Sequence, residues 1–390
     1  MKQPVTIVYP VPEALPDPRA RFIQIVNTCS ALAQSGVQVV LICGGGKGAT
    51  RDEILSFYGI PDHENLVIQP LPMLRRAGVG HFSVSWHGVF QISLLSHLMR
   101  ESSYRKAWTV LFVRHLKLAA FLLKWKRLIP FPMIFEVHEI FHLTTVKKKK
   151  RDLLKALEEH VYHRADAIVA ISHAIEDFLV AMNIPESSIH VIHNGIKKEW
   201  FDLHSRTSPS YICYTGSLYA WKGVDTIIAA MRYLPGERLL IVGGGSRLDE
   251  LKSLAAREGV SDRVVFAGPV PHSAIPHYLS QAKITILPNV PDGPTEFSSP
   301  LKLFEYMASG IPIVATDIPV FREILTDRVN AMICKPNNPE TLASCIDEIV
   351  HNRGMAAELG RNAKELAINY TYEKRAEKIL SVIDGILLQA

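Results

Sequence analysis

The residues from Ser298 to Gly310 are of types that suit an anionic ligand. Their order, Ser-Ser-Pro-Leu-Lys-Leu-Phe-Glu-Tyr-Met-Ala-Ser-Gly, predicts a short helix that Ser299 caps and Gly310 ends. The start of a helix offers free N–H groups and the positive end of a dipole, and both favour a phosphate. Because the proline has no N–H, we expect the amides of Leu301 and Lys302 to be the donors, supported by the Lys302 ammonium and the Ser299 hydroxyl.

Glu305 follows Lys302 by three residues and therefore shares its face of the predicted helix. A carboxylate at this position could accept two hydrogen bonds from a vicinal diol such as a ribose. The same spacing also fits a capped helix with a Lys302–Glu305 surface pair and no ligand. The residues of this stretch leave both interpretations open.

Apolar strands alternate with helices along the chain, which is typical of parallel sheets with helices on both faces. In the first half we expect strands at residues 5–9, 37–42, 66–70, 109–113, 133–137, 167–171 and 190–192. In the second half we expect strands at residues 211–214, 238–242, 264–266 and 284–287 and a further one from residue 311. The main helices are expected at residues 19–34, 151–164, 172–182, 248–258 and 275–281 and between 339 and 390. The predicted fold is α/β, with two doubly wound Rossmann-like domains in tandem.

In doubly wound sheets, ligands bind beyond the carboxyl ends of the strands, and two such edges that face each other form a cleft. This rule selects one set of residues from each half of the chain. The set consists of Arg114, His138, Ser172 and Asn194 in the first half and of Ser217, Lys222, Gly243 and the residues from Ser299 to Glu305 in the second.

Length and composition exclude several classes of protein. A chain of 390 residues suggests two domains, which we place at 1–204 and 205–370. The five cysteines lack C-x-x-C spacing, which argues against a disulfide framework or a zinc site and indicates a reducing compartment. No apolar stretch is long enough to span a bilayer without a charge, and the first residues do not resemble a signal peptide. We therefore expect a cytoplasmic protein.

The net charge of +5 is unevenly distributed. Residues 1–204 carry 24 Lys and Arg against 18 Asp and Glu, whereas the remainder carries 19 against 20. The basic half contains the run from Lys147 to Arg151 and an apolar segment, 111–135, that basic residues interrupt. Such a face could rest on an anionic membrane or attract an anionic substrate. A solvated turn beside a core helix with long lysine side chains would have the same composition.

Several of these motifs resemble those of the retaining glycosyltransferases of family 4. The residues from Tyr214 to Leu218 with Lys222-Gly223 are similar to the family's Gly-Arg-Leu…Lys-Gly loop, and the residues from Ser299 to Ala315 resemble its donor-binding helix. Residues 135–139 and 191–196 look like landmarks of the family's first domain. Residues 370–375 look like the start of its C-terminal helix, about 371–390, which returns to the first domain. The resemblance implies the two-domain glycosyltransferase B architecture and a nucleotide-sugar donor.

The resemblance also implies roles for individual residues. Lys222 would neutralise the donor diphosphate, the amides of Leu301 and Lys302 would hold phosphate oxygens, and Glu305 would bind the ribose. His138 matches a histidine beside the transferred sugar or the acceptor, and with Lys222 and Glu305 it forms the expected catalytic set. The expected donor-binding residues are Gly216, Ser217, Lys222, Gly243, Ser299, Leu301, Lys302 and Glu305, and the expected acceptor-side residues are Arg19, Arg114, His138 and Asn194. No Asp-x-Asp motif is present, so we expect neither a metal nor another cofactor.

Two positions depart from the family pattern. Ser217 stands where the family has arginine, so one cationic phosphate contact is either missing or supplied elsewhere, for which Arg19 and Arg21 are the candidates. Phe297 stands at the first glutamate of the family's Glu-x7-Glu pair, for which Glu296 could substitute only after a shift of one residue.

The predicted function is retaining, metal-independent transfer of a sugar from a nucleotide sugar to a glycan, a lipid-linked molecule or a small molecule, with no nucleic-acid partner. In such a reaction the pre-placed cation and helix dipole would offset charge that builds on the leaving diphosphate. One alternative is a sugar-nucleotide epimerase, for which only His138 and Glu139 offer acid–base groups. Another is a non-catalytic subunit that binds nucleotide sugars, which the departures at Ser217 and Phe297 would favour.

Overall fold

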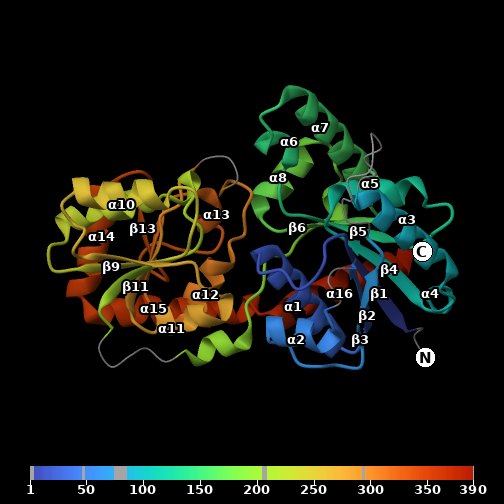
Figure 1. The fold of residues 1–390 in the computed structure, drawn as a ribbon, viewed down its shortest axis with the longest axis horizontal. Coiled ribbons are helices and arrows are strands. Elements are labelled where there is room, and N and C mark those ends of the chain that lie inside the picture. The colour runs from blue at the N-terminus through green and yellow to red at the C-terminus, as the bar shows by residue number, and fades with distance from the viewer. Residues whose placement is uncertain (1–3, 46–48, 74–85, 204–208, 292–294, 390) are drawn as a thin grey trace. The chain divides into compact units, whose positions relative to one another are not determined.

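The computed structural model describes residues 4–45, 49–73, 86–203, 209–291 and 295–389. The chain divides into two compact units (Figure 1). The first consists of Met1–His193 with Tyr372–Ala390, and the second consists of Asn194–Thr371. The domain boundary that the sequence predicts, between 204 and 205, lies outside the described residues.

The first unit is built on a seven-stranded parallel sheet with the strand order β3-β2-β1-β4-β5-β6-β7. Its strands are β1 (Val5–Val11), β2 (Gln38–Gly44), β3 (Leu66–Leu71), β4 (Trp108–Val113), β5 (Met133–Val137), β6 (Ala167–Ala170) and β7 (Ile189–Val191). Every residue of β5 and β6 is buried. Such continuous burial explains why these strands are apolar throughout instead of alternating, since a parallel sheet is covered on both faces.

The helices of the first unit are α1 (Ala20–Gln34), α2 (Arg51–Tyr58), α3 (Trp86–Arg100), α4 (Ser103–Lys106), α5 (Leu116–Lys124), α6 (Phe141–Thr144), α7 (Lys148–Tyr162), α8 (His173–Ala181) and α16 (Tyr372–Gln389). Helix α16 ends the chain but packs against α1, as Figure 1 shows. The predicted return of the C-terminal helix to the first half of the chain is therefore confirmed. Ser172 caps α8 by accepting a hydrogen bond from the amide of Ile175 at 3.4 Å.

The second unit repeats this plan with a six-stranded parallel sheet in the order β10-β9-β8-β11-β12-β13. Its strands are β8 (Tyr211–Thr215), β9 (Arg238–Val242), β10 (Val264–Gly268), β11 (Ala282–Leu287), β12 (Ile313–Thr316) and β13 (Met332–Cys334). Its helices are α9 (Val224–Ala230), α10 (Leu248–Arg257), α11 (Ile275–Leu279), α12 (Leu301–Ser309), α13 (Pro319–Arg322), α14 (Pro339–His351) and α15 (Arg353–Ala367). The predicted class, two doubly wound parallel sheets, is confirmed.

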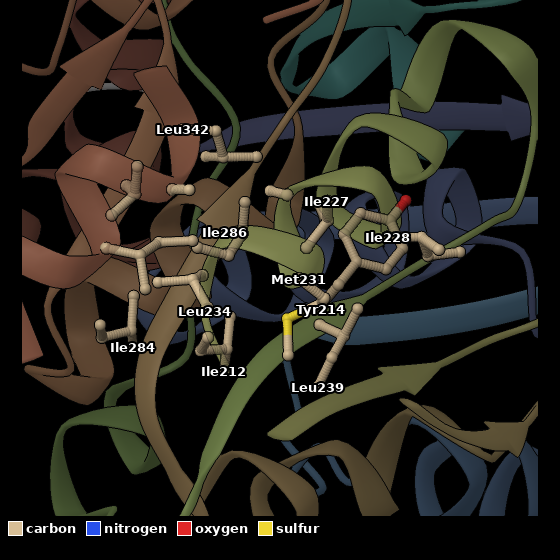
Figure 2. Packing of buried hydrophobic residues seen from close by; sticks show 14 of the residues in the cluster. Ile212, Tyr214, Ile227, Ile228, Met231, Leu234, Leu239, Ile284, Ile286 and Leu342 are labelled. Atoms are coloured by element: carbon tan, nitrogen blue, oxygen red, sulfur yellow. The ribbon is translucent and has the colours of Figure 1, made fainter. Parts of the chain in front are cut away.

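The core of the second unit lies on both faces of its sheet. On one face, apolar side chains of α9, α10 and α14 pack against the strands, and Figure 2 shows Tyr214 among Ile228, Met231 and their neighbours. On the other face, α11, α12 and α15 supply the buried side chains. Helix α12 is buried from Lys302 to Ser309, which includes two charged residues. Those two charges need partners or a ligand, because an unpaired charge is costly to bury.

Several elements differ from the sequence-based expectation, and helices α2, α3 and α13 were not predicted. Strand β13 was not predicted, because three residues of an edge strand carry too little periodic signal. Helix α7 begins at Lys148, three residues before the predicted start, so the lysine run forms its cap and first turn, where residues 147–150 are exposed. All five cysteines are free.

Candidate functional site

Two tyrosines fix the carboxyl end of β8 in the second unit. The Thr215 amide donates a hydrogen bond to the hydroxyl of Tyr306 on α12, at 2.7 Å. The Tyr214 hydroxyl donates to the carbonyl oxygen of Ser217, at 2.8 Å. Both tyrosine side chains are fully buried. The loop after β8 and the helix α12 are therefore held together by the core.

Two loops approach so closely at this strand end that only glycine fits. Gly216 has a φ of 133° and Gly243 a φ of 144°. A β-carbon on Gly243 would overlap the carbonyl oxygen of Gly216. The loops after β8 and β9 therefore meet backbone to backbone, which leaves main-chain groups at the surface of the site without side chains to cover them.

Lys302 lies next to this glycine loop with its charge unpaired. Its Nζ lies 4.0 Å from the centroid of the Tyr214 ring, a cation–π contact. The side chain is buried, and its Nζ has no hydrogen-bond partner among the described residues. Burial lowers the pKa of Lys302 well below its usual value, and the charge of Lys222 lowers it further.

Lys222 is the second cation of this group. It ends the short 3₁₀ turn Ala220–Lys222, and its side chain is half-buried. Burial lowers its pKa to about 8. No salt bridge to Lys222 or Lys302 occurs in the part of the chain that the structure describes. The charges of Lys222 and Lys302 repel each other, and that of Glu305 attracts Lys302. We call these two lysines with the start of α12 the lysine site.

The start of α12 completes the lysine site. The predicted Ser299 cap is wrong: Pro300 occupies the cap position, and no side chain caps the helix. Ser299 is instead held by Asn194, whose amide N donates to Oγ at 3.2 Å and whose Nδ2 donates to the carbonyl oxygen at 2.5 Å. Because helix geometry leaves the first amides without intrahelical partners, those of Leu301 and Lys302 are available to a ligand.

Glu305 is not part of a surface pair with Lys302, and that interpretation is wrong. The Glu305 side chain is buried, and its Oε1 lies 2.7 Å from Nε2 of His272. Burial alone would lower the pKa of His272, but the hydrogen bond and charge of Glu305 outweigh it and raise that pKa. This contact fixes the Glu305 side chain one turn along α12 from Lys302.

The first unit contains a separate cavity of 580 Å³ at the carboxyl ends of β1, β4 and β5. Its lining includes Arg21 on α1, Arg114 after β4, His138 after β5, and Lys150 in the first turn of α7. We call it the arginine pocket. Of the predicted residues, it brings together Arg114 and His138.

The base of the arginine pocket is a buried charge cluster. Glu136 on β5 lies between two guanidinium groups: its Oε1 is 3.1 Å from Nη1 of Arg114, and its Oε2 accepts a hydrogen bond from Arg375. Arg375 also donates to the carbonyl oxygens of Ile192 and His193, at 2.7 and 2.6 Å. Arg375 is thus fully engaged, whereas the Nε of Arg114 has no hydrogen-bond partner within the described ranges.

His138 is a neutral group of the arginine pocket. Burial lowers its pKa well below the usual value, and the charge of Arg114 adds to that effect. Its ring meets Phe141 edge-on at a centroid distance of 5.6 Å, and its Nδ1 has no hydrogen-bond partner among residues the structure describes. It can therefore exchange a hydrogen bond with a ligand without adding a charge.

Two expected residues lie elsewhere. Arg19 is exposed and pairs with Asp17 at 2.5 Å, outside the pocket lining. Arg21, which the sequence offered only as a phosphate contact, lines the arginine pocket instead. Asn194 belongs to the second unit, where it holds Ser299. Lys150 was singled out only as part of the basic run 147–151, without a link to the other pocket residues. Phe141 was not predicted, because it belongs to the four-residue helix α6, which carries too little periodic signal.

The described residues contain neither a cluster of metal ligands nor a membrane-spanning helix. No three His, Cys, Asp or Glu side chains among them are grouped to hold a metal ion. None of their helices combines the length and apolarity that crossing a membrane requires.

Comparisons with known proteins give the family and the fold of the chain. The sequence model of "Glycosyl transferases group 1" matches residues 196–366, and that of "Glycosyltransferase Family 4" matches residues 23–200. Among curated relatives, the D-inositol 3-phosphate glycosyltransferase of Mycobacteroides abscessus is 27% identical over 240 residues, which are 57% of this chain and 53% of the relative. The uncharacterized glycosyltransferase MJ1069 of Methanocaldococcus jannaschii is 26% identical over 60% of this chain and 62% of the relative. The matched region thus spans less than two thirds of these relatives.

Solved structures match over nearly the whole chain. Anabaena Alr3699/HepE in complex with UDP has a TM-score of 0.74 at 15% identity and covers 99% of this chain and 100% of that one. The sucrose-phosphate synthase of Thermosynechococcus elongatus has a TM-score of 0.73 at 17% identity, with both chains covered in full. At these identities the likeness establishes the fold, which is the glycosyltransferase B fold.

Proposed function

The chain belongs to the glycosyltransferases of group 1 and family 4, and from this premise we propose that it transfers a sugar from a nucleotide-diphosphate sugar to an acceptor hydroxyl. The observation that carries the proposal is the lysine site. Lys222 and Lys302 stand together beside the uncapped start of α12, and neither makes a salt bridge to a carboxylate among the described residues. A diphosphate supplies the missing negative charge, and similar folds have been solved with UDP and UDP-glucose.

The residues of the lysine site would have separate roles in the reaction. The ammonium groups and the first amides of α12 offset the charge that develops on the diphosphate when the sugar–phosphate bond breaks. We propose that these groups take the place of a resident metal ion. The Glu305 carboxylate, held by His272, remains our candidate for the ribose hydroxyls.

We also propose that the reaction retains the configuration of the sugar. In this scheme the acceptor oxygen attacks the anomeric carbon from the face that the diphosphate leaves. The C–O bond to phosphate breaks, and a phosphate oxygen takes the acceptor proton. No protein nucleophile is needed, and the neutral His138 provides a hydrogen bond on the acceptor side. The anomeric configuration of the product, measured by NMR, tests this scheme.

The direct test of the function is a set of assays with the purified chain. Nucleotide sugars are screened by thermal shift, because a ligand that binds the native state raises its stability. Sugar transfer or donor hydrolysis is then measured with and without EDTA. We expect activity that survives EDTA. Binding without turnover would identify a nucleotide-sugar-binding subunit instead, and a strict requirement for Mg²⁺ would contradict the metal-free site.

Lys222→Ala should lower turnover more than donor affinity. The reason is that charge on the diphosphate grows from ground state to transition state, so the lost cation matters most there. Steady-state kinetics against the donor give kcat and KM separately, and circular dichroism checks the fold of the variant. A raised KM with an unchanged kcat would show that Lys222 only binds the donor.

We further propose that the first unit rests on an anionic leaflet through a groove between α5 and α7. The groove has a volume of 880 Å³ and is lined by leucines and by five basic residues, namely Lys124, Lys126, Arg127, His160 and Arg164. Leu153 at its edge is exposed. Basic residues near an anionic leaflet contribute about 1 kcal/mol each. Co-sedimentation with anionic and neutral vesicles at low and high salt tests this; binding to neither vesicle type at low salt would refute it.

A further inference from the structure

The arginine pocket carries more positive charge than its own carboxylates balance. Four cations line it, namely Arg21, Arg114, Lys117 and Lys150, against Glu13 and Glu139. Both carboxylates already have protein partners. Glu13 lies 2.7 Å from Nη2 of Arg21, and Glu139 accepts a hydrogen bond from the hydroxyl of Thr144 at 2.8 Å. The lining therefore offers a net charge of about +2, which an anion of similar charge would balance.

A purely structural role does not explain the position of Arg114. Only 9% of the residue is exposed, and its Nε has no hydrogen-bond partner among the described residues. Its neighbour Glu136 is already bound by Arg375, so the buried cluster holds two guanidinium groups for one carboxylate. An uncompensated buried charge is unfavourable. The Arg114 guanidinium lies at the base of a cavity, where a ligand can reach it.

Helix α7 adds positive charge to the pocket from its N-terminal end, which is the positive end of its dipole. Lys148, Lys149 and Lys150 form its first turn, which contains no acidic residue. Cations are unfavourable near the positive end of a helix dipole, so these lysines do not stabilise the helix. Lys150 lines the pocket, on the side of α7, while Arg21 lines it from α1. Burial lowers the pKa of the Arg21 guanidinium, the charge of Glu13 opposes this effect, and the charges of Arg19 and Arg114 add to it.

We propose that the arginine pocket binds the acceptor through a phosphate monoester, with Arg114 and Arg21 as its main contacts and Lys150 as a further cation. A guanidinium presents parallel N–H donors that match phosphate oxygens, and the dianion matches the charge of the lining. The volume of 580 Å³ suits a molecule of the size of a sugar phosphate or a lipid headgroup. Only the identification of this ligand as the acceptor rests on the proposed function; the anion site stands on the first unit alone.

The test compares glucose 6-phosphate with glucose as probes of the purified full-length chain. Isothermal titration calorimetry is performed on wild type and on Arg114→Gln, Arg21→Gln, Arg114→Lys and the exposed control Arg105→Gln. We expect the phosphate to bind and the neutral sugar to bind far more weakly. Arg114→Gln and Arg21→Gln should weaken phosphate binding by about 10- to 100-fold, the range for lost charged hydrogen bonds. Arg114→Lys should be intermediate, because it keeps the charge but loses the paired donors.

The variant Lys222→Ala separates this pocket from the lysine site, which also attracts phosphates. Phosphate binding that persists in Lys222→Ala and is lost in Arg114→Gln supports the proposal. Loss in Lys222→Ala alone, equal binding of glucose and its phosphate, or no binding to wild type would each overturn it. Arg114→Gln should fold, since Glu136 keeps Arg375, and unchanged thermal unfolding without ligand is the check.

Two further experiments ask whether the phosphate belongs to a lipid or to a soluble molecule, and whether the proposed enzymatic function can fail while the anion site remains. The first experiment uses phosphatidic acid vesicles. If they bind wild type but not Arg114→Gln, and if glucose 6-phosphate displaces them, the natural phosphate belongs to a lipid. If glucose 6-phosphate binds tightly but does not displace the vesicles from the protein, the acceptor is soluble. UDP-sugar binding is followed in the same variants. Its absence in wild type, with phosphate binding intact, would refute the proposed function and leave the anion site standing.

Discussion

At the scale of single residues, the two lysines of the second unit are poised to gain protons when an anion binds. Burial lowers the pKa of Lys222 to about 8, so part of the population is neutral in the free protein at slightly alkaline pH. A bound diphosphate favours the charged form and raises this pKa. Binding above pH 8 must therefore be accompanied by proton uptake.

This linkage predicts that affinity for a nucleoside diphosphate falls above pH 8, by up to about tenfold per pH unit for each proton taken up. Calorimetric titration of UDP in buffers of different ionisation enthalpy measures both the affinity and the protons. The variant Lys222→Met should show weaker binding and a smaller dependence on pH. A wild-type affinity that is the same at pH 7 and pH 9 would contradict a shifted Lys222.

The His272–Glu305 pair predicts a second pH effect, on stability. Because Glu305 raises the pKa of His272 in the folded state, the pair contributes stability that is present below the unfolded pKa of about 6.5. That stability is lost as pH rises through the folded pKa. Lys197, whose charge opposes the protonated form, and Trp200, whose ring lies 5.6 Å away, are the other neighbours.

We expect urea unfolding to show wild type more stable than His272→Gln in mildly acidic buffer, with the difference shrinking towards pH 8 and above. The shrinkage follows from the deprotonation of His272 in the wild type alone. His351→Gln, which removes an exposed histidine of α14, serves as the control and should leave the pH profile unchanged. A constant difference between wild type and His272→Gln would indicate that His272 stays neutral.

At the scale of elements, the sequence predicted the strands and helices that hydrophobic periodicity and local turn residues mark. The strand at 133–137 and that at 238–242 match β5 and β9 residue for residue, because continuous apolar runs between turns are characteristic of buried parallel strands. The start of α12 was wrong by one residue, because Ser299 is claimed by Asn194, 105 residues away in the chain. The same long-range contacts explain why His272 as the partner of Glu305 was missed: it lies 33 residues earlier, and nothing local marks it.

The junction between the β8 and β9 loops is the element-scale feature most sensitive to substitution. Gly243→Ala places a methyl group against the carbonyl oxygen of Gly216 and forces alanine to a φ of 144°. We expect a loss of about 3 kcal/mol or more in unfolding free energy, together with weaker nucleotide binding. Gly236→Ala, at a turn with nothing within 4 Å of the added carbon, is the matched control and should be close to neutral.

At the scale of the whole molecule, the end of the chain is part of the first unit's core. Helix α16 reaches back across the sequence to pack on α1, and Arg375 on its first turns joins Thr28, Glu136, Ile192 and His193. Three other segments of the first unit thus converge on one guanidinium of α16. The contacts could not be predicted from sequence, because they join residues up to 347 positions apart.

This convergence predicts that Arg375 stabilises the first unit far more than an ordinary charged residue. Arg375→Ala leaves Glu136 buried with only Arg114 beside it and leaves two carbonyl oxygens without a donor, so we expect a loss of about 3–5 kcal/mol. Lys374→Ala, which removes an exposed pair with Glu377, should cost at most about 1 kcal/mol. Hydrogen exchange localises the effect: amides of β5 and β7 should lose protection in Arg375→Ala while those of β9 and β11 keep it. Equal loss in both sheets would mean that α16 supports the second unit as well, and unchanged protection of β5 would show that the guanidinium network does not hold the first unit together.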